Sequence, residues 1–296
     1  MRPALYGSGG KTERMRVGIV AKPESERAVA VAGAVADRVI DAAHSVVVEE
    51  TTLAALATLR GDDGTITGVP LDDLADCDLI VSVGGDGTFL YAARSAGRTP
   101  VLGVNVGEVG FLNAVDPADA PAVTVETAAH LTEADTPALK AVPRIAASGP
   151  EWRLDPAVND VVIMGERRGH GGGLDVTVRV DGARYTAGRA DGVLVATPVG
   201  STAYNLSEGG PLVHHAVDGL VVAGMAGDGL RPPLVVGADS VVSVAVEGAP
   251  EGVVVGDGRV RRSIEPPTTV TVERAGEPLR IAEPSLDFYS ALEKLD

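Results

Sequence analysis

The chain has 296 residues, a length that suits two domains and a sizeable hydrophobic core. Its 25 basic and 41 acidic residues give a net charge of -16, which argues against nucleic acid as a partner because phosphate binding needs a cationic surface. No apolar run reaches the ~18–20 residues of a membrane helix and no signal peptide opens the sequence, and the single Cys77 cannot form an internal disulfide. We therefore expect a cytoplasmic protein with no membrane partner.

The basic residues are nearly all arginine, and the only lysines are Lys11, Lys22, Lys140 and Lys294. A strongly acidic, lysine-poor chain suits a very salty cytoplasm, where dissolved ions screen the repulsion between carboxylates. The composition thus predicts a salt-adapted habitat and says nothing about chemistry.

The first part of the chain alternates strands and helices. Gly10-Lys11-Thr12 looks like the end of a P-loop, but Leu5 occupies the position where that motif needs a glycine. We therefore expect residues 1–14 to be a flexible extension. Strands are predicted from Met15, at "SVVVEE", at "LIVSV" and at "PVLGVNV", with a helix over 25–43 that Ser25 caps. This order predicts an α/β domain over 15–116 with an open, mostly parallel sheet and ligands at the carboxyl ends of its strands.

The second part is rich in β-branched residues. Runs such as "LDVTVRV", "DGVLVATPV", "SVAVEG" and "TTVTVER" are bounded by Gly, Asp and Pro, and several alternate apolar with polar residues. We expect a β-rich domain over 117–281, an active site in the cleft between the two domains, and a tail, 282–296, that packs back on the first domain.

A glycine-rich loop, Gly84-Gly85-Asp86-Gly87-Thr88, follows the third of these strands. Its glycines let backbone N–H groups face an anion, and the next helix adds its positive end. An aspartate there makes sense if it accepts a proton from a hydroxyl that attacks phosphorus. The alternative is an ordinary turn in which Asp86 caps the helix. A dinucleotide fingerprint G-x-G-x-x-G is absent.

A second cluster, "DGVLVATPVGSTAYNLSEGGPLV", runs from Asp191 to Val213. It predicts a strand, a turn and a helix that starts near Ser201. The short hydroxyl and amide side chains at this start suit a polyhydroxylated, phosphorylated ligand. A capped helix terminus without a ligand is the alternative.

Taken together, these stretches resemble the NAD kinase family over nearly the whole chain from Met15, and the composition points to a source similar to a halophilic archaeon. The resemblance rests on "GGDGT", on "NVGEVGFL" (105–112), on Asn159-Asp160 in "VNDVVI", and on the block from Asp191 through "GSTAYNLSEGGP". Diacylglycerol and sphingosine kinases share "GGDGT", but the other motifs separate this chain from them.

The resemblance implies phosphorylation of the adenosine ribose 2′-hydroxyl of NAD, giving NADP, with ATP or polyphosphate as donor and Mg²⁺ or another divalent cation as cofactor. Asp86 would accept the proton and Gly87 would pass close to the dinucleotide. The donor phosphates would face Gly84, Gly85, Gly87 and Thr88. No protein-bound metal site is implied.

The same resemblance implies the dinucleotide contacts. Asn159 would read the adenine edge, Asp160 would accept hydrogen bonds from ribose hydroxyls, and Phe111 would pack on the adenine ring unless it is an ordinary core residue. Asp191 would contact the nicotinamide end, and Arg189 would lie near the dinucleotide phosphates or a neighbouring subunit of a homodimer or homotetramer. The further contacts would be Thr202, Ala203, Tyr204, Asn205, Leu206, Ser207 and Ala226.

Two departures from the family pattern leave the donor preference and the shape of the nicotinamide pocket open. Val199 replaces the usual threonine before "GSTAY", and "GDGLRPP" lacks a histidine that the family often has. Two other functions stay possible alternatives: a lipid kinase, although the acidic chain lacks a basic membrane-facing element, and a non-catalytic dinucleotide sensor.

A histidine pair and an arginine pair lie outside these motifs. His214-His215 is expected to be a surface pair, because no third ligand lies at metal-site spacing. Arg167 and Arg168 lie in an expected loop and could attract a polyphosphate donor.

Overall fold

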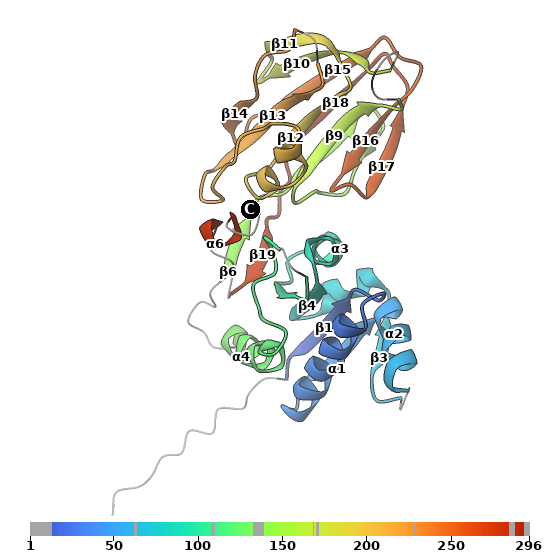
Figure 1. Ribbon diagram of the computed structural model, residues 1–296, viewed down its shortest axis with the longest axis vertical. Coiled ribbons are helices and arrows are strands. Elements are labelled where there is room, and N and C mark those ends of the chain that lie inside the picture. The colour runs from blue at the N-terminus through green and yellow to red at the C-terminus, as the bar shows by residue number, and fades with distance from the viewer. Residues whose placement is uncertain are drawn as a thin grey trace, which may run out of the picture.

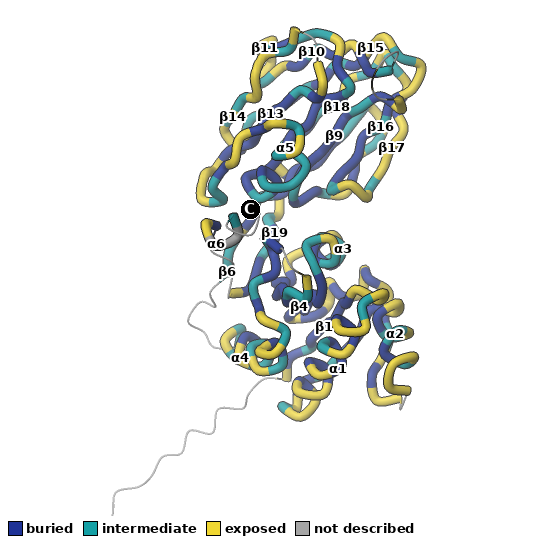
Figure 2. Tube along the Cα trace, in the orientation of Figure 1, coloured by how far each residue is buried: buried dark blue, intermediate teal, exposed yellow. Residues whose placement is uncertain are grey.

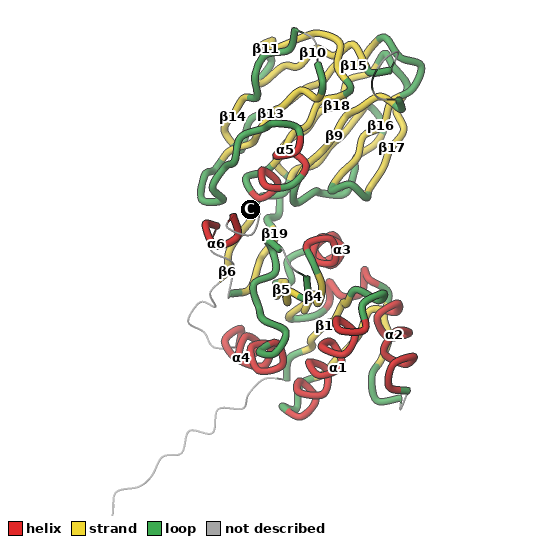
Figure 3. Tube along the Cα trace, in the orientation of Figure 1, coloured by secondary structure: helices red, strands yellow, loops and turns green. Residues whose placement is uncertain are grey.

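The computed structural model describes residues 14–61, 64–107, 110–132, 139–167, 169, 172–227, 229–283 and 288–292. Apart from Arg14, the predicted N-terminal extension lies outside these residues, and so does Arg168. Figure 1 shows an α/β part below and a β-rich part above, with β6, β19 and α6 where they meet. The strands, yellow in Figure 3, dominate the upper part, whereas the longer helices lie in the lower one.

The lower part is built on one seven-stranded sheet with the order β3-β2-β1-β4-β5-β19-β6. Strands β1 to β5 are parallel, β19 is parallel to β5, and β6 is antiparallel to β19. The strands are β1 (Arg16–Ala21), β2 (Ser45–Glu49), β3 (Thr67–Val69), β4 (Leu79–Gly84), β5 (Val101–Asn105), β6 (Leu139–Val142) and β19 (Leu279–Ala282). The helices are α1 (Glu26–Asp41), α2 (Glu50–Arg60), α3 (Asp86–Ser95), α4 (Ala120–Thr132) and the 3₁₀ turn η1 (Leu71–Asp76).

The sequence dictates these elements locally. Ser25 caps α1 by accepting the backbone N–H of Ala28 at 3.2 Å, as predicted. Strand β4 is buried along its whole length, because helices cover both faces of a parallel sheet. The buried residues, dark blue in Figure 2, therefore run through the strands, and the loops after β1, β4 and β5 open at the same edge of the sheet.

The upper part consists of two six-stranded antiparallel sheets, with the orders β11-β10-β15-β18-β7-β8 and β14-β13-β12-β9-β16-β17. One core of mainly valine side chains joins the two sheets. The strands are β7 (Ile145–Gly149), β8 (Trp152–Arg153), β9 (Asp160–Gly165), β10 (Leu174–Val180), β11 (Ala183–Ala190), β12 (Gly192–Ala196), β13 (Gly219–Met225), β14 (Leu234–Gly237), β15 (Val242–Glu247), β16 (Gly252–Gly256), β17 (Val260–Ile264) and β18 (Thr268–Arg274). Short helical turns are η2 (Val199–Thr202) and α5 (Tyr204–Ser207).

The predicted fold class, an α/β part with a β-rich part, is confirmed, but the elements divide differently from the prediction. Helix α4 packs against α1, and β6 and β19 complete the first sheet, although we assigned 117–281 to the β-rich domain. The first part of the molecule therefore extends beyond residue 116, the predicted domain boundary. The chain leaves the first sheet after β6 and returns to it only at β19.

A buried arginine joins the two parts at this crossover. The guanidinium of Arg144, 4% exposed, donates to the backbone oxygens of Gly97 at 2.9 Å and Glu277 at 3.1 Å. Gly97 follows α3, so this side chain ties the helix of the glycine-rich loop to the segment that enters and leaves the β-rich part.

The C-terminal helix α6 (Phe288–Leu292) lies where the two parts meet (Figure 1). Phe288 contacts His214 and His215 edge-on, with ring centroids 4.9 and 5.6 Å apart, and lines a small cavity with Lys140 and Val142 of β6. The histidine pair is thus an aromatic contact of this helix. None of the helices in the described ranges is both long and apolar enough to cross a membrane.

Candidate active site

The glycine-rich loop joins the carboxyl end of β4 directly to α3. A Cβ on Gly84 would overlap the Thr88 side chain, so glycine is required there. Gly85 faces open space, and a Cβ on Gly87 would lie 3.2 Å from Arg259 Nη2. Gly85 is the N-cap residue of α3 and no side chain caps the helix. Thr88 and Phe89 donate their backbone N–H groups to the Gly85 carbonyl, whereas those of Asp86 and Gly87 have no acceptor among the described residues and stay available to an anion.

Asp86 does not cap its helix, so the ordinary-turn interpretation is wrong. Its carboxylate instead accepts the backbone N–H groups of Phe111 at 2.9 Å and Leu112 at 3.1 Å, and the side-chain amide of Asn113 at 3.2 Å. These donors come from the loop after β5, within the predicted "NVGEVGFL" landmark and just beyond it. Three donors fix the carboxylate beside the glycine-rich loop.

A cavity of about 340 Å³, which we call the glycine-loop cavity, opens beside this loop. Its lining is Ala21, Lys22, Pro23, Glu24, Thr51, Gly85, Gly87, Thr88, Tyr91 and Arg259. Lys22 follows β1, whereas Arg259 comes from the β16–β17 turn of the other part. Within the described part of the chain, no acidic side chain forms an ion pair with either cation. The cavity thus combines a helix N-terminus with two cations and one carboxylate, that of Glu24.

A second cavity of about 340 Å³, the Asn159 cavity, lies at the start of β9. It is lined by Asn159, Asp160, Val162, Met164, Ala203, Tyr204, Val255, Asp257, Gly258 and Arg261. The side-chain oxygen of Asn159 is buried and has no hydrogen-bond partner among the described residues. Such an atom is costly to leave unpaired, which indicates a ligand donor at this position.

The Asn159 cavity holds two buried carboxyl groups. Burial, and secondarily the charge of Asp257, raise the pKa of Asp160 from 3.8 to about 7. Burial also raises the pKa of Asp257, while hydrogen bonds from the backbone of Val158, Asn159 and Asp160 oppose the rise. Both carboxyl groups therefore keep their protons to higher pH than exposed aspartates do.

The predicted hydroxyl-rich segment lies between the two parts. Gly200 is required here, because a Cβ would overlap the backbone carbonyl of Asn159. Thr202 donates to the Val199 carbonyl at 3.1 Å, and both residues line a small cavity with Phe111 and Leu112. Phe111 is therefore not an ordinary core residue, and it brings the Asp86 loop against η2.

The remaining residues of this segment either line the Asn159 cavity or stabilise the turn. Ala203 and Tyr204 line the Asn159 cavity. Asn205 is fully buried and its amide donates to the carbonyls of Ser201 at 3.1 Å and Pro211 at 3.0 Å, so it holds the turn together. Leu206 is half-buried and Ser207 is exposed.

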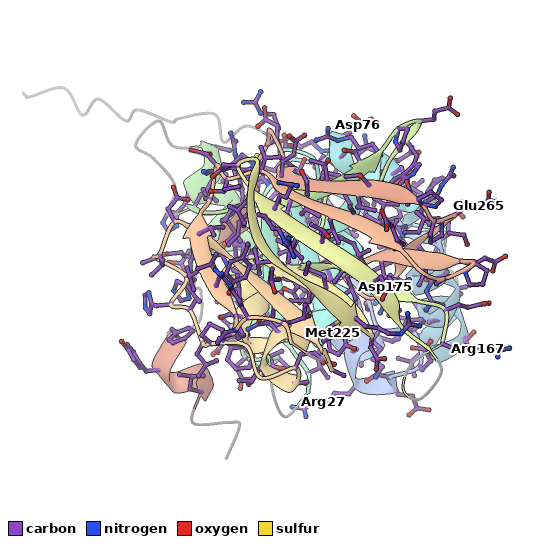
Figure 4. The ribbon with its side chains drawn as sticks, turned by 90° about the horizontal axis from the view of Figure 1, so that it is seen from above. Arg27, Asp76, Arg167, Asp175, Met225 and Glu265 are labelled. Atoms are coloured by element: carbon purple, nitrogen blue, oxygen red, sulfur yellow. The ribbon has the colours of Figure 1, made fainter. Side chains whose placement is uncertain are left out.

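Three predicted dinucleotide contacts lie elsewhere. Arg189, Asp191 and Ala226 gather at the opposite end of β12, because Gly192 pairs with Met225 there while Ala196 pairs with Asp160 at the site end. Arg189 forms an ion pair with Asp175 at 3.2 Å. Figure 4 labels Asp175 and Met225, which mark this far end, and Arg167.

The far end of β12 has a separate cavity and hydrogen bonds of its own. Asp191 accepts the backbone N–H of Gly169 at 2.9 Å. Arg167 and Arg189 line a cavity of about 310 Å³. Strand β12 spans five residues, or roughly 17 Å, so one chain does not bring these groups next to Asn159.

The sequence interpretation missed Lys22, Arg259, Asp257 and Arg261. The last three lie in "GDGRVR", where a D-G turn between two β-rich runs predicts a hairpin at most. Only the tertiary fold brings this turn to the glycine-rich loop. Among the described residues, no group of three or more His, Cys, Asp or Glu could hold a metal ion.

The comparisons with known proteins agree over most of the chain. The ATP-NAD kinase N-terminal domain matches residues 17–133, and the ATP-NAD kinase C-terminal domain matches residues 158–283. The chain is 54% identical over 282 residues to the NAD kinase of Haloarcula marismortui, covering 95% of this chain and 100% of that protein. It is 56% identical over 281 residues to the NAD kinase of Halorubrum lacusprofundi, with the same coverage. Both are halophilic archaea, as the composition predicts.

Solved structures show the same fold. The NAD kinase from Archaeoglobus fulgidus, crystallised in complex with ATP, superposes with a TM-score of 0.74 at 26% identity, covering 95% of this chain and 98% of that one. Yeast NADH kinase complexed with NADH superposes with a TM-score of 0.83 at 22% identity, covering 95% of this chain and 87% of that one, which shows a shared fold. The chain belongs to the NAD kinase family, the enzymes that phosphorylate NAD to NADP with ATP.

Proposed function

We propose that this chain carries out the family reaction with the donor phosphates in the glycine-loop cavity and the adenosine of NAD in the Asn159 cavity. The observation that carries the proposal is that the β16–β17 turn borders both cavities. Gly258 lines the Asn159 cavity and the next residue, Arg259, lines the glycine-loop cavity. A hydroxyl held on one side of this turn can therefore meet a phosphate held on the other.

The donor site is cationic in an otherwise acidic protein. Lys22 and Arg259 face the open N-terminus of α3, and the backbone at Gly85, Gly87 and Thr88 follows the same wall. Gly84 supports it by accommodating Thr88. Phosphate chains bind such surfaces through backbone amides and cations. ATP is the donor of the family, and we extend the proposal to polyphosphate, because the two cations and the helix N-terminus can bind the phosphate chain of either donor.

A divalent cation such as Mg²⁺ enters with the donor in this proposal. Magnesium keeps several waters and is usually bound through substrate phosphates and one or two carboxylates. It would neutralise charge on the transferred group, while this chain's own residues position the two substrates.

Asp86 accepts the proton of the 2′-hydroxyl or orients it for attack. Its three hydrogen bonds hold the carboxylate in place beside the glycine-rich loop, which is the fixed position that a base acting on a hydroxyl needs. Gly87, the next residue, leaves room for the dinucleotide to approach. Phosphoryl transfer depends mainly on positioning, so the fixed orientation matters as much as basicity.

The dinucleotide contacts follow from the Asn159 cavity. The buried Asn159 oxygen accepts the adenine amino group, Asp160 accepts ribose hydroxyls, and Ala203 with Tyr204 forms the opposite wall. Phe111 and Thr202 extend this surface towards Asp86. Leu206 and Ser207 continue the same short helix, and Asn205 supports it from within.

A homo-oligomer is part of this proposal. Arg189, Asp191 and Ala226 lie at the far end of β12, so they reach a dinucleotide only if it is bound to a second copy of the chain. We propose a homodimer or homotetramer in which this far end, with Arg167, faces the nicotinamide side of a neighbour's site. The proposed location is the cytoplasm, in keeping with the single, buried Cys77 thiol.

One assay tests the function. Purified protein in molar salt, given NAD, magnesium and either ATP or polyphosphate, should convert NAD to NADP. NAD binding without turnover on either donor would favour a non-catalytic sensor. Phosphorylation of diacylglycerol in its place would favour the lipid-kinase alternative.

A further inference from the structure

We propose that Asp257 is a positioning residue of the dinucleotide site: its carboxylate fixes the backbone of residues 158–160 so that the side chains of Asn159 and Asp160 face the ligand. The inference rests on the proposed roles of these two side chains. It assigns the β16–β17 turn a task distinct from that of Arg259.

The contact is made entirely through backbone amides. One oxygen of Asp257 accepts the N–H of Val158 at 2.8 Å, and the other accepts the N–H of Asn159 at 2.7 Å and of Asp160 at 3.2 Å. Three successive N–H groups converge on one carboxylate, 98 residues away in sequence from the central one. Hydrogen bonds to a charged acceptor are stronger than those between neutral groups.

The carbonyl groups of the same segment are occupied as well. Thr197 donates its hydroxyl to the Val158 oxygen at 2.6 Å and its backbone N–H to the Asn159 oxygen at 2.9 Å. The Asp160 oxygen accepts the backbone N–H of Asp257 at 3.0 Å. Every backbone polar group of residues 158–160 therefore has a partner, and the side chains of Asn159 and Asp160 are left for the cavity.

The backbone of Asp257 is itself unusual. Its φ of 47° lies in the left-handed region, which few side chains other than those of Asn and Asp adopt readily. The turn is narrow, because Gly256 pairs with Val260 across it. This conformation lets one residue return both its N–H and its carboxylate to the start of β9.

The substitution Asp257→Asn isolates the carboxylate, because asparagine tolerates the same backbone conformation but presents an NH₂ group where one oxygen accepts an N–H. Loss of one or two charge-assisted hydrogen bonds should raise KM for NAD by roughly 10- to 100-fold. The change in kcat should be smaller, because Asp86 and the donor cavity are untouched.

Asp181→Asn is a matched control. Asp181 has a φ of 50° in a D-G turn, exchanges bonds with Val241 through its own N–H (3.0 Å) and its carboxylate (2.9 Å), and lies in the exposed β10–β11 turn. It should leave KM for NAD unchanged. Asn159→Ala, measured alongside, separates two failures. If it raises KM while Asp257→Asn does not, the positioning inference is wrong; if neither raises it, the proposed NAD site is wrong too.

A pH profile supplies a readout that a purely structural role would not move. The other titratable groups that line the cavity of Asp160 are Asp257, Arg261 of β17 and Tyr204 of α5, and the charge of Asp257 acts on Asp160. Removing the charge of Asp257 makes ionisation of Asp160 easier, so the acidic limb of kcat/KM for NAD should move to lower pH.

Unchanged KM and an unchanged acidic limb would overturn the proposal. Asp257→Glu keeps the charge and both oxygens, so it should recover part of the affinity and leave the limb in place. If Asp257→Asn does not fold, Asp257→Glu serves as the test. Its longer side chain must displace the backbone amides of residues 158–160. A raised KM for NAD would then support the inference, and an unchanged KM would contradict it.

Discussion

The carboxylate of Asp86 accepts the backbone N–H of Phe111 at 2.9 Å, and this bond joins the first residue of α3 to the loop after β5. Phe111 in turn lines a cavity with Val199 and Thr202 of the β-rich part. The proposed base is thus oriented by a loop that also touches the second domain.

The first prediction concerns Asp86→Asn. The amide keeps the size of the side chain but cannot take a proton at neutral pH, and removing a general base typically lowers rates by ~10²–10⁴-fold, or roughly 3–5 kcal/mol of barrier. NAD binding should change much less, because the adenine and ribose contacts are assigned to the Asn159 cavity. Steady-state rates and equilibrium NAD binding of the variant measure this contrast.

Asn113→Ala is the control for Asp86. It removes the side-chain donor at 3.2 Å and leaves the two backbone donors, so it tests orientation without removing the base. A loss well below that of Asp86→Asn is expected. Near wild-type turnover by Asp86→Asn would mean that Asp86 is a structural residue and that another group or the phosphate itself takes the proton.

The sequence predicts the fold class because strong local signals mark it. The buried run of β4 and the Ser25 cap of α1 were both found where the pattern indicated. Helix α4 was missed because "APAVTVETAAHLT" is rich in β-branched residues and carries a weak helical pattern. Strands β6 and β19 pair although more than 130 residues separate them in the sequence, and no local pattern can predict such a pairing.

The site was predictable only where residues sit in motifs. Asp86 and Asn159 lie in such motifs, whereas Arg259 and Asp257 belong to a turn that looks like any D-G hairpin. Their roles come from the packing of one part against the other. For the same reason, the sequence could not show that Arg189 and Asp191 lie at the far end of β12.

The second prediction concerns Arg259→Ala. The guanidinium lies beside Gly87 in the glycine-loop cavity, so its loss should raise KM for ATP by roughly tenfold, the size expected for one charge-assisted bond to a phosphate. KM for NAD should change little. Initial rates at varied ATP and fixed NAD measure the effect.

Arg262→Ala is its matched control, because Arg262 is an exposed arginine of the same hairpin that does not line either main cavity. Both variants remove one positive charge from the same hairpin. Equal effects on KM for ATP would indicate a general electrostatic influence and would contradict a direct role of Arg259.

The third prediction is that the protein loses stability when salt is removed. With a net charge of -16, its carboxylates repel one another over a Debye length that grows from ~3 Å at molar salt to ~30 Å at ten millimolar. The ion pairs of the described residues are exposed, for example Arg60–Asp37, so their strengthening at low salt offsets little of this repulsion. Melts followed by circular dichroism measure it, and an equal midpoint in dilute buffer and molar salt would refute it.

The fourth prediction concerns Asp160→Asn and the pH dependence of stability. Burial first, and the Asp257 charge second, raise the pKa of Asp160 from 3.8 to about 7, so the folded state binds a proton that the unfolded state releases between these values. This group therefore favours folding least above pH 7, and its contribution falls as pH rises from about 4 to 7.

Asp160→Asn removes the group that must ionise in this buried position. The variant should gain stability over wild type at pH 8, by up to a few kcal/mol, and should gain little at pH 4.5, where the wild-type carboxyl is protonated in the folded protein. The same substitution should weaken NAD binding, because it removes the carboxylate that is proposed to accept the ribose hydroxyls. Thermal melts of both proteins at the two pH values in molar salt measure the difference. Asp155→Asn, which changes an exposed carboxylate of the same part, is the control for the loss of one negative charge. If Asp160→Asn were equally destabilised at both pH values, hydrogen bonds made by the carboxylate would outweigh its burial, and the raised pKa would not describe this site.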